Sequence, residues 1–69
     1  MPRPLISQRL RTARISAGLT VRQLAAEAGL SHTTVVRSEQ GHTTPTLATL
    51  QALSEALGVS VAKLTEGAP

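Results

Sequence analysis

Several residue types that carry chemistry are missing from the 69-residue sequence, which contains no cysteine, no aspartate and no aromatic residue. Without cysteine, neither a disulfide nor a thiolate zinc site can stabilise the fold, which fits a reducing cytosol. His32 and His42 are the only histidines, and their spacing matches no zinc pattern. The four glutamates suit no nucleophile–base arrangement, and no glycine-rich phosphate loop occurs. We therefore expect no enzymatic activity, no cofactor and no metal, and no small-molecule ligand is evident.

Long apolar runs are missing too. No stretch approaches the ~18 residues of a membrane-spanning helix. The start, MPRPLISQ, lacks the apolar core of a signal peptide. We expect no membrane partner and a cytoplasmic location.

Alanine and leucine supply most of the apolar residues, with ten of each against two isoleucines. A chain of this length forms one domain and buries only about 60% of its unfolded surface. Alanine lets helices approach closely, whereas the β-branched residues are too few for a sheet. The composition therefore predicts a compact all-α domain.

Positive charge is concentrated in the first half of the chain. Residues 1–37 hold six arginines against one glutamate, a net charge of +5. Residues 38–69 hold Lys63 against three glutamates, a net charge of −2. One basic end indicates a polyanionic partner. The alternative is that the arginines serve solubility alone.

The first helix is predicted over residues 5–17. Four apolar residues recur at spacings of four, three and four and mark its core side: Ile6, Leu10, Ala13 and Ala17. Pro2 and Pro4 exclude a helix before it. Arg3 makes these first residues a basic arm, which is either a frayed terminus or an arm that enters a minor groove.

The stretch from Thr20 to Gly41 predicts two short helices separated by a tight turn. Thr20 is a candidate N-cap, and the first helix has an apolar side formed by Val21, Leu24, Ala25 and Ala28. Gly29 ends this helix, and Ser31 caps the second, which runs over His32–Gln40. On the second helix Val35 and Glu39 share one side. The other side is almost wholly polar and comprises His32, Thr33, Val36, Arg37 and Gln40.

A polar loop over residues 42–45 leads to a further helix behind the candidate cap Thr46. Its apolar side is predicted to close the core and comprises Leu47, Leu50, Leu53 and Leu57. Gly58 ends this helix, and a last turn, capped by Ser60, docks against the core through Leu64.

Many of these positions occur at the spacing of a known family. Ala25, Gly29 and Val35, together with Glu39 and Gly41, resemble the helix-turn-helix of the Cro/phage-repressor type, the xenobiotic-response-element class of regulators. The likeness extends over nearly the whole chain, including Arg9, Leu10, Arg14, Gly18, Leu19, Thr20, Pro45, Leu53 and Leu64. It implies a compact four- to five-helix, lambda-repressor-like DNA-binding domain. We place this domain at 5–65, between a flexible basic arm, 1–4, and a flexible end, 66–69.

The resemblance further implies a structural ion pair between Arg14 and Glu39, which ties the first helix to the second motif helix. It also implies a homodimer on an inverted-repeat operator, and a bacterial or phage-type protein associated with the nucleoid. Two features depart from the family pattern. Val21 stands where many relatives have glutamine, and the second motif helix is not glutamine-rich. These departures concern which DNA sequence is read rather than the fold.

The second motif helix has the side chains needed to read bases. A helix fits the major groove, where Arg37 can donate two hydrogen bonds to guanine and Val36 suits a thymine methyl. The predicted base-reading residues are His32, Thr33, Val36, Arg37 and Gln40. Helix N-termini, hydroxyl groups and arginine suit phosphates. The predicted phosphate-contacting residues are Thr20, Arg22, Ser31, His42, Thr43 and Thr44.

Two functions compete. The first is a sequence-specific regulator of transcription, a repressor, that binds double-stranded DNA through His32–Gln40. The alternative is a protein-interaction module of the same fold, an antitoxin- or coactivator-like adaptor that reads no DNA. A protein contact favours an apolar or aromatic surface. His32, Arg37 and Gln40 are polar, so the sequence favours DNA.

Overall fold

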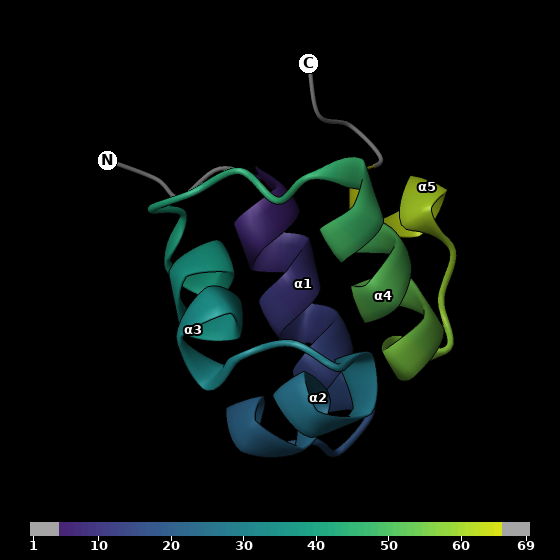
Figure 1. The fold of residues 1–69 in the computed structure, drawn as a ribbon. Helices are drawn as coiled ribbons and strands as arrows, with labels where there is room; N and C mark the ends of the chain where they lie inside the picture. The colour runs from purple at the N-terminus through teal and green to yellow at the C-terminus, as the bar shows by residue number, and fades with distance from the viewer. Residues whose placement is uncertain (1–4, 66–69) are drawn as a thin grey trace.

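The structure, a computed structural model, describes residues 5–65 and arranges them as five helices (Figure 1). The helices are α1 (Leu5–Ser16), α2 (Val21–Ala28), α3 (His32–Gln40), α4 (Leu47–Leu57) and α5 (Val61–Thr65). Within these residues no strand occurs, and the predicted all-α architecture is confirmed. The predicted arm, 1–4, and the predicted end, 66–69, lie outside the described residues.

The core lies where all five helices meet. Helix α1 packs against α3 and α5, and α2 packs against α3 and α4. Eight buried residues form the centre of the core: Leu10, Leu24, Ala25, Val35, Leu50, Leu53, Leu57 and Leu64. Every helix contributes at least one of them. The longest helix, α1, has only 12 residues, and isolated helices of that length are marginal in water, so packing in the core stabilises all five.

Hydroxyl side chains begin the helices of the motif and of α4. The side chains of Thr20, Ser31 and Thr46 each accept a hydrogen bond from the backbone N–H three residues later, at 3.1, 3.1 and 3.2 Å. Each such cap contributes about 1 kcal/mol to stability. Gly29 ends α2 with a left-handed backbone, φ 69°, which turns the chain toward α3 within two residues. The motif therefore owes its tight turn to local sequence.

Two residues that were predicted to lie in the core are exposed. Helix α1 ends at Ser16, and Ala17 lies in the following turn, where it is exposed; Leu19 packs against the core instead. Leu47 is 64% exposed. Ser54 lies two turns further along the same side of α4 and is buried, so Leu47 is exposed because it begins the helix and not because of its helical phase.

Candidate nucleic-acid interface

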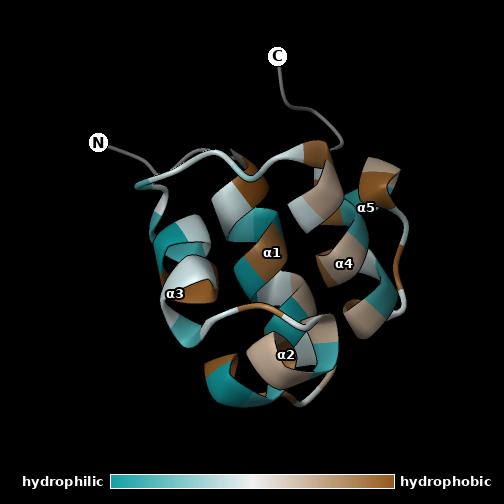
Figure 2. Cartoon of the chain, in the orientation of Figure 1, coloured by the Kyte–Doolittle hydropathy of each residue, from teal (hydrophilic) through white to brown (hydrophobic). Residues whose placement is uncertain are grey.

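Helix α3 has two chemically different sides. Its inward side contains Val35, Ser38 and Glu39, all buried. Four of the five predicted base-reading residues are exposed: His32, Thr33, Arg37 and Gln40. In Figure 2, α3 is mostly teal and white with a brown segment, so most of its residues are hydrophilic. The inward side holds α3 in the core and leaves the polar side at the surface.

The exposed polar side of α3 does not stabilise the fold through side-chain polar contacts among the described residues. None of the side chains of His32, Thr33, Arg37 and Gln40 takes part in a hydrogen bond or ion pair there. By contrast, the neighbouring hydroxyl groups are used within the helix. Ser31 caps α3 and lies 2.7 Å from the Thr34 hydroxyl, and Ser38 donates to the Thr34 carbonyl at 2.9 Å. The four exposed side chains are free to bind something else.

A largely buried ion pair joins α3 to α1. The Arg14 guanidinium donates from Nε to Oε2 of Glu39 at 2.7 Å and from Nη2 to Oε1 at 3.2 Å. Its third nitrogen, Nη1, donates to the Leu19 carbonyl at 2.9 Å. The side chains of Arg14 and Glu39 are 14% and 7% exposed, so water screens the pair little. One arginine thus connects α1, α3 and the segment that precedes α2.

Val36 occupies a different position from the other predicted base-reading residues, because it is only partly exposed. It lines a hollow of about 200 Å³ together with Val21 at the start of α2 and Gln40 on α3. Arg11 of α1 lines the same hollow and was not among the predicted site residues. The sequence held a signal for it, because Arg11 lies one turn before Arg14, whose side chain reaches α3. The hollow therefore lies where α1 meets the two motif helices, α2 and α3.

The predicted phosphate-contacting residues lie at the surface in two groups. Thr20, Arg22 and Ser31 belong to the first turns and caps of α2 and α3, and all three are exposed. Thr20 forms a capping box, since its N–H donates to Oε1 of Gln23 at 2.8 Å while its hydroxyl accepts from the Gln23 N–H. The second group, His42, Thr43 and Thr44, is exposed in the loop that follows α3. Ser31 thus lies at the start of α3 and the second group follows its end, whereas Thr20 and Arg22 lie at the start of α2, where Val21 lines the hollow with Val36 and Gln40.

Two other features are absent from the described part of the chain. Residues 5–65 bring together no group of three side chains from His, Cys, Asp and Glu that could hold a metal ion. None of the five described helices is both long and apolar enough to cross a bilayer.

Helix α2, the tight turn at Gly29 and α3 with its outward polar side together form a helix-turn-helix. The profile of the helix-turn-helix family HTH_3 matches residues 10–64, and the chain belongs to this family of DNA-binding regulators, the Cro/repressor type. The class consists of regulators that bind DNA and not of enzymes.

Individual relatives agree with this assignment. The chain is 37% identical over 62 residues to the HTH-type transcriptional regulator DdrOP3 of Deinococcus deserti, covering 90% of this chain and 48% of that regulator. The chain thus spans about half the length of this relative. Its fold is similar to the N-terminal DNA-binding domain of SinR from Bacillus subtilis, with a TM-score of 0.86 and 30% identity over 90% of this chain and 91% of that one.

A third relative was solved together with DNA. The P22 c2 repressor in complex with a synthetic operator has a TM-score of 0.84 and 30% identity to this chain. The match covers 91% of this chain and 96% of the repressor chain. The similarity therefore extends over the whole helical domain and not only over the motif.

Proposed function

We propose that this protein is a sequence-specific regulator of transcription that binds double-stranded DNA with α3 in the major groove. The observation that carries the proposal is the exposed side of α3, where His32, Thr33, Arg37 and Gln40 have no partner among the described residues. Each offers hydrogen bonds to base edges, and the major groove presents a distinct pattern at each base pair. Val36, at the edge of this side, meets a thymine methyl.

Phosphate contacts set the depth and register of α3 in the groove. The free N–H groups at the start of α2 and the guanidinium of Arg22 approach one strand, together with Thr20 and Ser31. His42, Thr43 and Thr44 contact the backbone beyond the C-terminal end of α3. Arg11, which lines the hollow beside Val36 and Gln40, supplies one more cation on this side. The excess of +5 over residues 1–37 supports this arrangement.

The regulatory effect that we propose is repression, in which the bound protein excludes the transcription machinery from overlapping DNA. The P22 c2 repressor, a relative solved on its operator, supports this direction of control. The proposal is tested first by selecting duplexes from a random DNA pool with the purified chain. A reporter under a promoter that overlaps the selected site then measures the effect. Expression must fall when the protein is produced.

Two arginines of equal charge separate base reading from simple attraction. Arg37 lies on the exposed side of α3, whereas Arg22 lies in the first turn of α2. Arg37→Ala is expected to weaken binding to the selected site by ~1–3 kcal/mol and to unrelated DNA much less. Arg22→Ala is expected to weaken binding to both DNAs alike and to reduce the salt slope by about one charge. Fluorescence anisotropy with labelled duplexes at several salt concentrations measures both.

Two outcomes contradict the proposal. If Arg37→Ala lowers affinity for selected and unrelated DNA equally, α3 does not read bases through this residue. If the unmodified chain binds neither DNA at low salt, the fold serves a protein contact, and an adaptor function replaces the regulator.

A further inference from the structure

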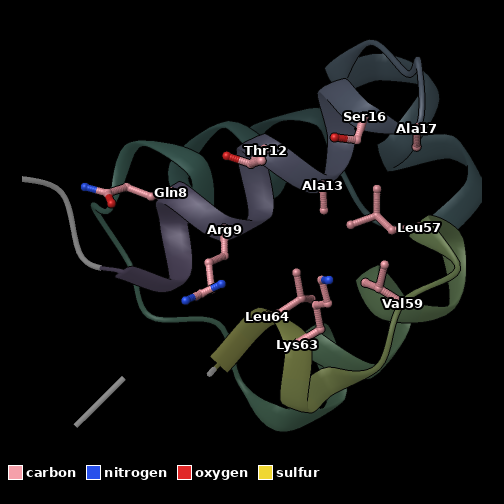
Figure 3. Close-up of a pocket in the computed structure, with 10 residues that line it drawn as sticks. All are labelled: Gln8, Arg9, Thr12, Ala13, Ser16, Ala17, Leu57, Val59, Lys63 and Leu64. Atoms are coloured by element: carbon pink, nitrogen blue, oxygen red, sulfur yellow. The ribbon is translucent and has the colours of Figure 1, made fainter. Parts of the chain in front are cut away.

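A groove of about 570 Å³ lies on the side of the molecule where α1 faces α5 (Figure 3). One wall is α1 and the residue that follows it. The other wall comes from the end of α4, the connection to α5, and α5 itself. None of the residues proposed to contact DNA lines it, and Figure 1 shows α3 and α5 on opposite sides of α1. The groove is separate from the candidate DNA interface.

The α1 wall consists of two rows with different chemistry. Arg9, Ala13 and Ala17 recur every four residues, and Gln8, Thr12 and Ser16 form a parallel row. Residues four apart lie above one another on the same side of a helix. The methyl groups of Ala13 and Ala17 leave the space that a larger side chain would fill, while the second row forms a polar rim. The groove therefore has an apolar floor and one hydrophilic edge.

The two ends of the groove differ in polarity. Figure 3 shows Arg9 toward one end, Lys63 beside Leu64 in the middle, and Leu57 and Val59 toward the other end. All the charged residues that line the groove are cations. The Arg9 Nε is buried and has no hydrogen-bond partner within residues 5–65, and the ion pair found in that part of the chain is the one between Arg14 and Glu39. A groove with two cations and an apolar floor is complementary to a ligand that has a negative charge and an apolar part.

We infer that this groove binds a small amphiphilic carboxylate. Its carboxylate accepts charge-assisted hydrogen bonds from Arg9 and Lys63, and its hydrocarbon chain lies along Ala13 toward Leu57 and Val59. The volume of about 570 Å³ falls within the ~300–1,000 Å³ of small-molecule sites. An inorganic anion would leave the apolar end without a partner, and a neutral hydrocarbon would leave the Arg9 Nε without one. Only a molecule with both parts matches both ends.

The test uses octanoate at neutral pH with the ¹⁵N-labelled full chain. Nuclear magnetic resonance is the suitable readout because the sequence has no aromatic residue for fluorescence. Octanoate is expected to cause saturable shifts of the backbone signals of Ala13, Ala17, Val59 and Lys63. Acetate, which lacks the chain, and octan-1-ol, which lacks the charge, are each expected to bind about tenfold more weakly.

Matched variants test the assigned chemistry. Lys63 is exposed, so Lys63→Gln leaves the core intact, and together with Arg9→Gln it is expected to weaken octanoate binding about tenfold while leaving octan-1-ol unaffected. Ala17→Leu fills the apolar end and is expected to weaken both ligands. Arg22→Gln removes the same charge from α2 and must change neither. Thermal unfolding of each variant verifies that it is folded.

Three results overturn the inference. The first is an absence of localised, saturable shifts with octanoate. The second is equal binding of acetate or octan-1-ol, which assigns the groove to charge alone or to apolar contact alone. The third concerns the backbone signals of the residues that line the groove. If these signals shift with protein concentration and do not respond to octanoate, a second copy of the chain occupies the groove.

Discussion

Arg14 uses all three of its guanidinium nitrogens to join separate segments of the chain. Two nitrogens bind the Glu39 carboxylate, and the third binds the Leu19 carbonyl in front of α2. The geometry is bidentate and largely shielded from water, which makes the charge-assisted hydrogen bonds strong. Glu39 lies on the inward side of α3. Its bonds to Arg14 therefore keep that side facing the core and the opposite side facing solvent.

We predict that Glu39→Ala destabilises the domain by ~3–5 kcal/mol, because it strands the buried charge of Arg14. Glu55, which is exposed on α4, provides the matched control, and Glu55→Ala is expected to change the free energy of unfolding by less than ~0.5 kcal/mol. Urea unfolding followed by far-ultraviolet circular dichroism measures both values.

The double variant Arg14→Leu with Glu39→Leu sharpens this test. It removes both buried charges and is expected to recover part of the loss. Recovery is incomplete, because the Leu19 carbonyl then loses its donor. Small and equal effects of Glu39→Ala and Glu55→Ala would show that the ion pair contributes nothing to stability.

At the scale of single side chains, the sequence predicted which residues of α3 are exposed but not what surrounds them. Helical phase separates His32 and Arg37 from Val35 and Glu39, since all four lie on one helix. It says nothing about Arg11 and Val21, which belong to other helices and meet Val36 in the hollow. The position of Val36 between surface and interior follows from those neighbours.

The helices themselves begin and end where local chemistry requires. Thr20, Ser31 and Thr46 each satisfy a backbone N–H at the start of a helix, and left-handed glycines end α2, α3 and α4. These interactions span at most a few residues, so they can be predicted from a short window of sequence. The end of α1 was predicted one residue too late, because Ala17 is as good a helix former as its neighbours and only the turn at Gly18 excludes it.

We predict that Thr20→Ala lowers the stability of the domain by about 1 kcal/mol, because the capping box at the start of α2 loses its hydroxyl. Thr20→Ser retains the hydroxyl and serves as the control, with a loss that is expected to be much smaller. Thermal unfolding monitored by circular dichroism gives both values.

The same pair of variants tests the proposed phosphate contact. If Thr20 also binds phosphate, Thr20→Ala weakens DNA binding and Thr20→Ser restores it, both measured at a temperature where each variant is fully folded. A Thr20→Ala variant as stable as the unmodified chain would show that the capping box is dispensable. Unchanged DNA affinity would place the phosphate elsewhere.

On the scale of the whole molecule, the domain presents a small reading surface. One helix of nine residues, with five proposed base-reading side chains, contacts too few base pairs to select a site in a genome. Two copies related by a two-fold axis double that surface without any new contact chemistry. The overall dimensions, 28 × 22 × 22 Å, allow two domains to lie side by side along one face of the duplex.

We predict that the chain binds as a two-fold pair to an inverted repeat whose half-sites are about one helical turn apart. Duplexes selected from a random pool are expected to show this symmetry, and sedimentation is expected to give two chains per duplex. Inserting about five base pairs between the half-sites puts them on opposite faces of the DNA and is expected to abolish cooperative binding. A selected site without symmetry, bound by one chain, would contradict the prediction.

Sequence by itself determined the all-α class, four helices followed by a last turn, and the polar side of α3. Each of these depends on interactions between residues at most four positions apart, or on a periodicity that one helix displays alone. The resemblance to the Cro/repressor type added the expectation that Arg14 and Glu39 meet, a contact between residues 25 positions apart that no local pattern reveals.

Only the tertiary structure decided which helices lie side by side. That arrangement exposes Leu47 at the start of α4, draws Val36 into a hollow with Arg11, and opens a groove in which Arg9 and Lys63 share an apolar floor. Arg9 and Lys63 are 54 positions apart, and they line the same groove because α1 packs against α5. Packing between distant segments is set by the fit of all five helices at once, and no single stretch of the chain contains that information.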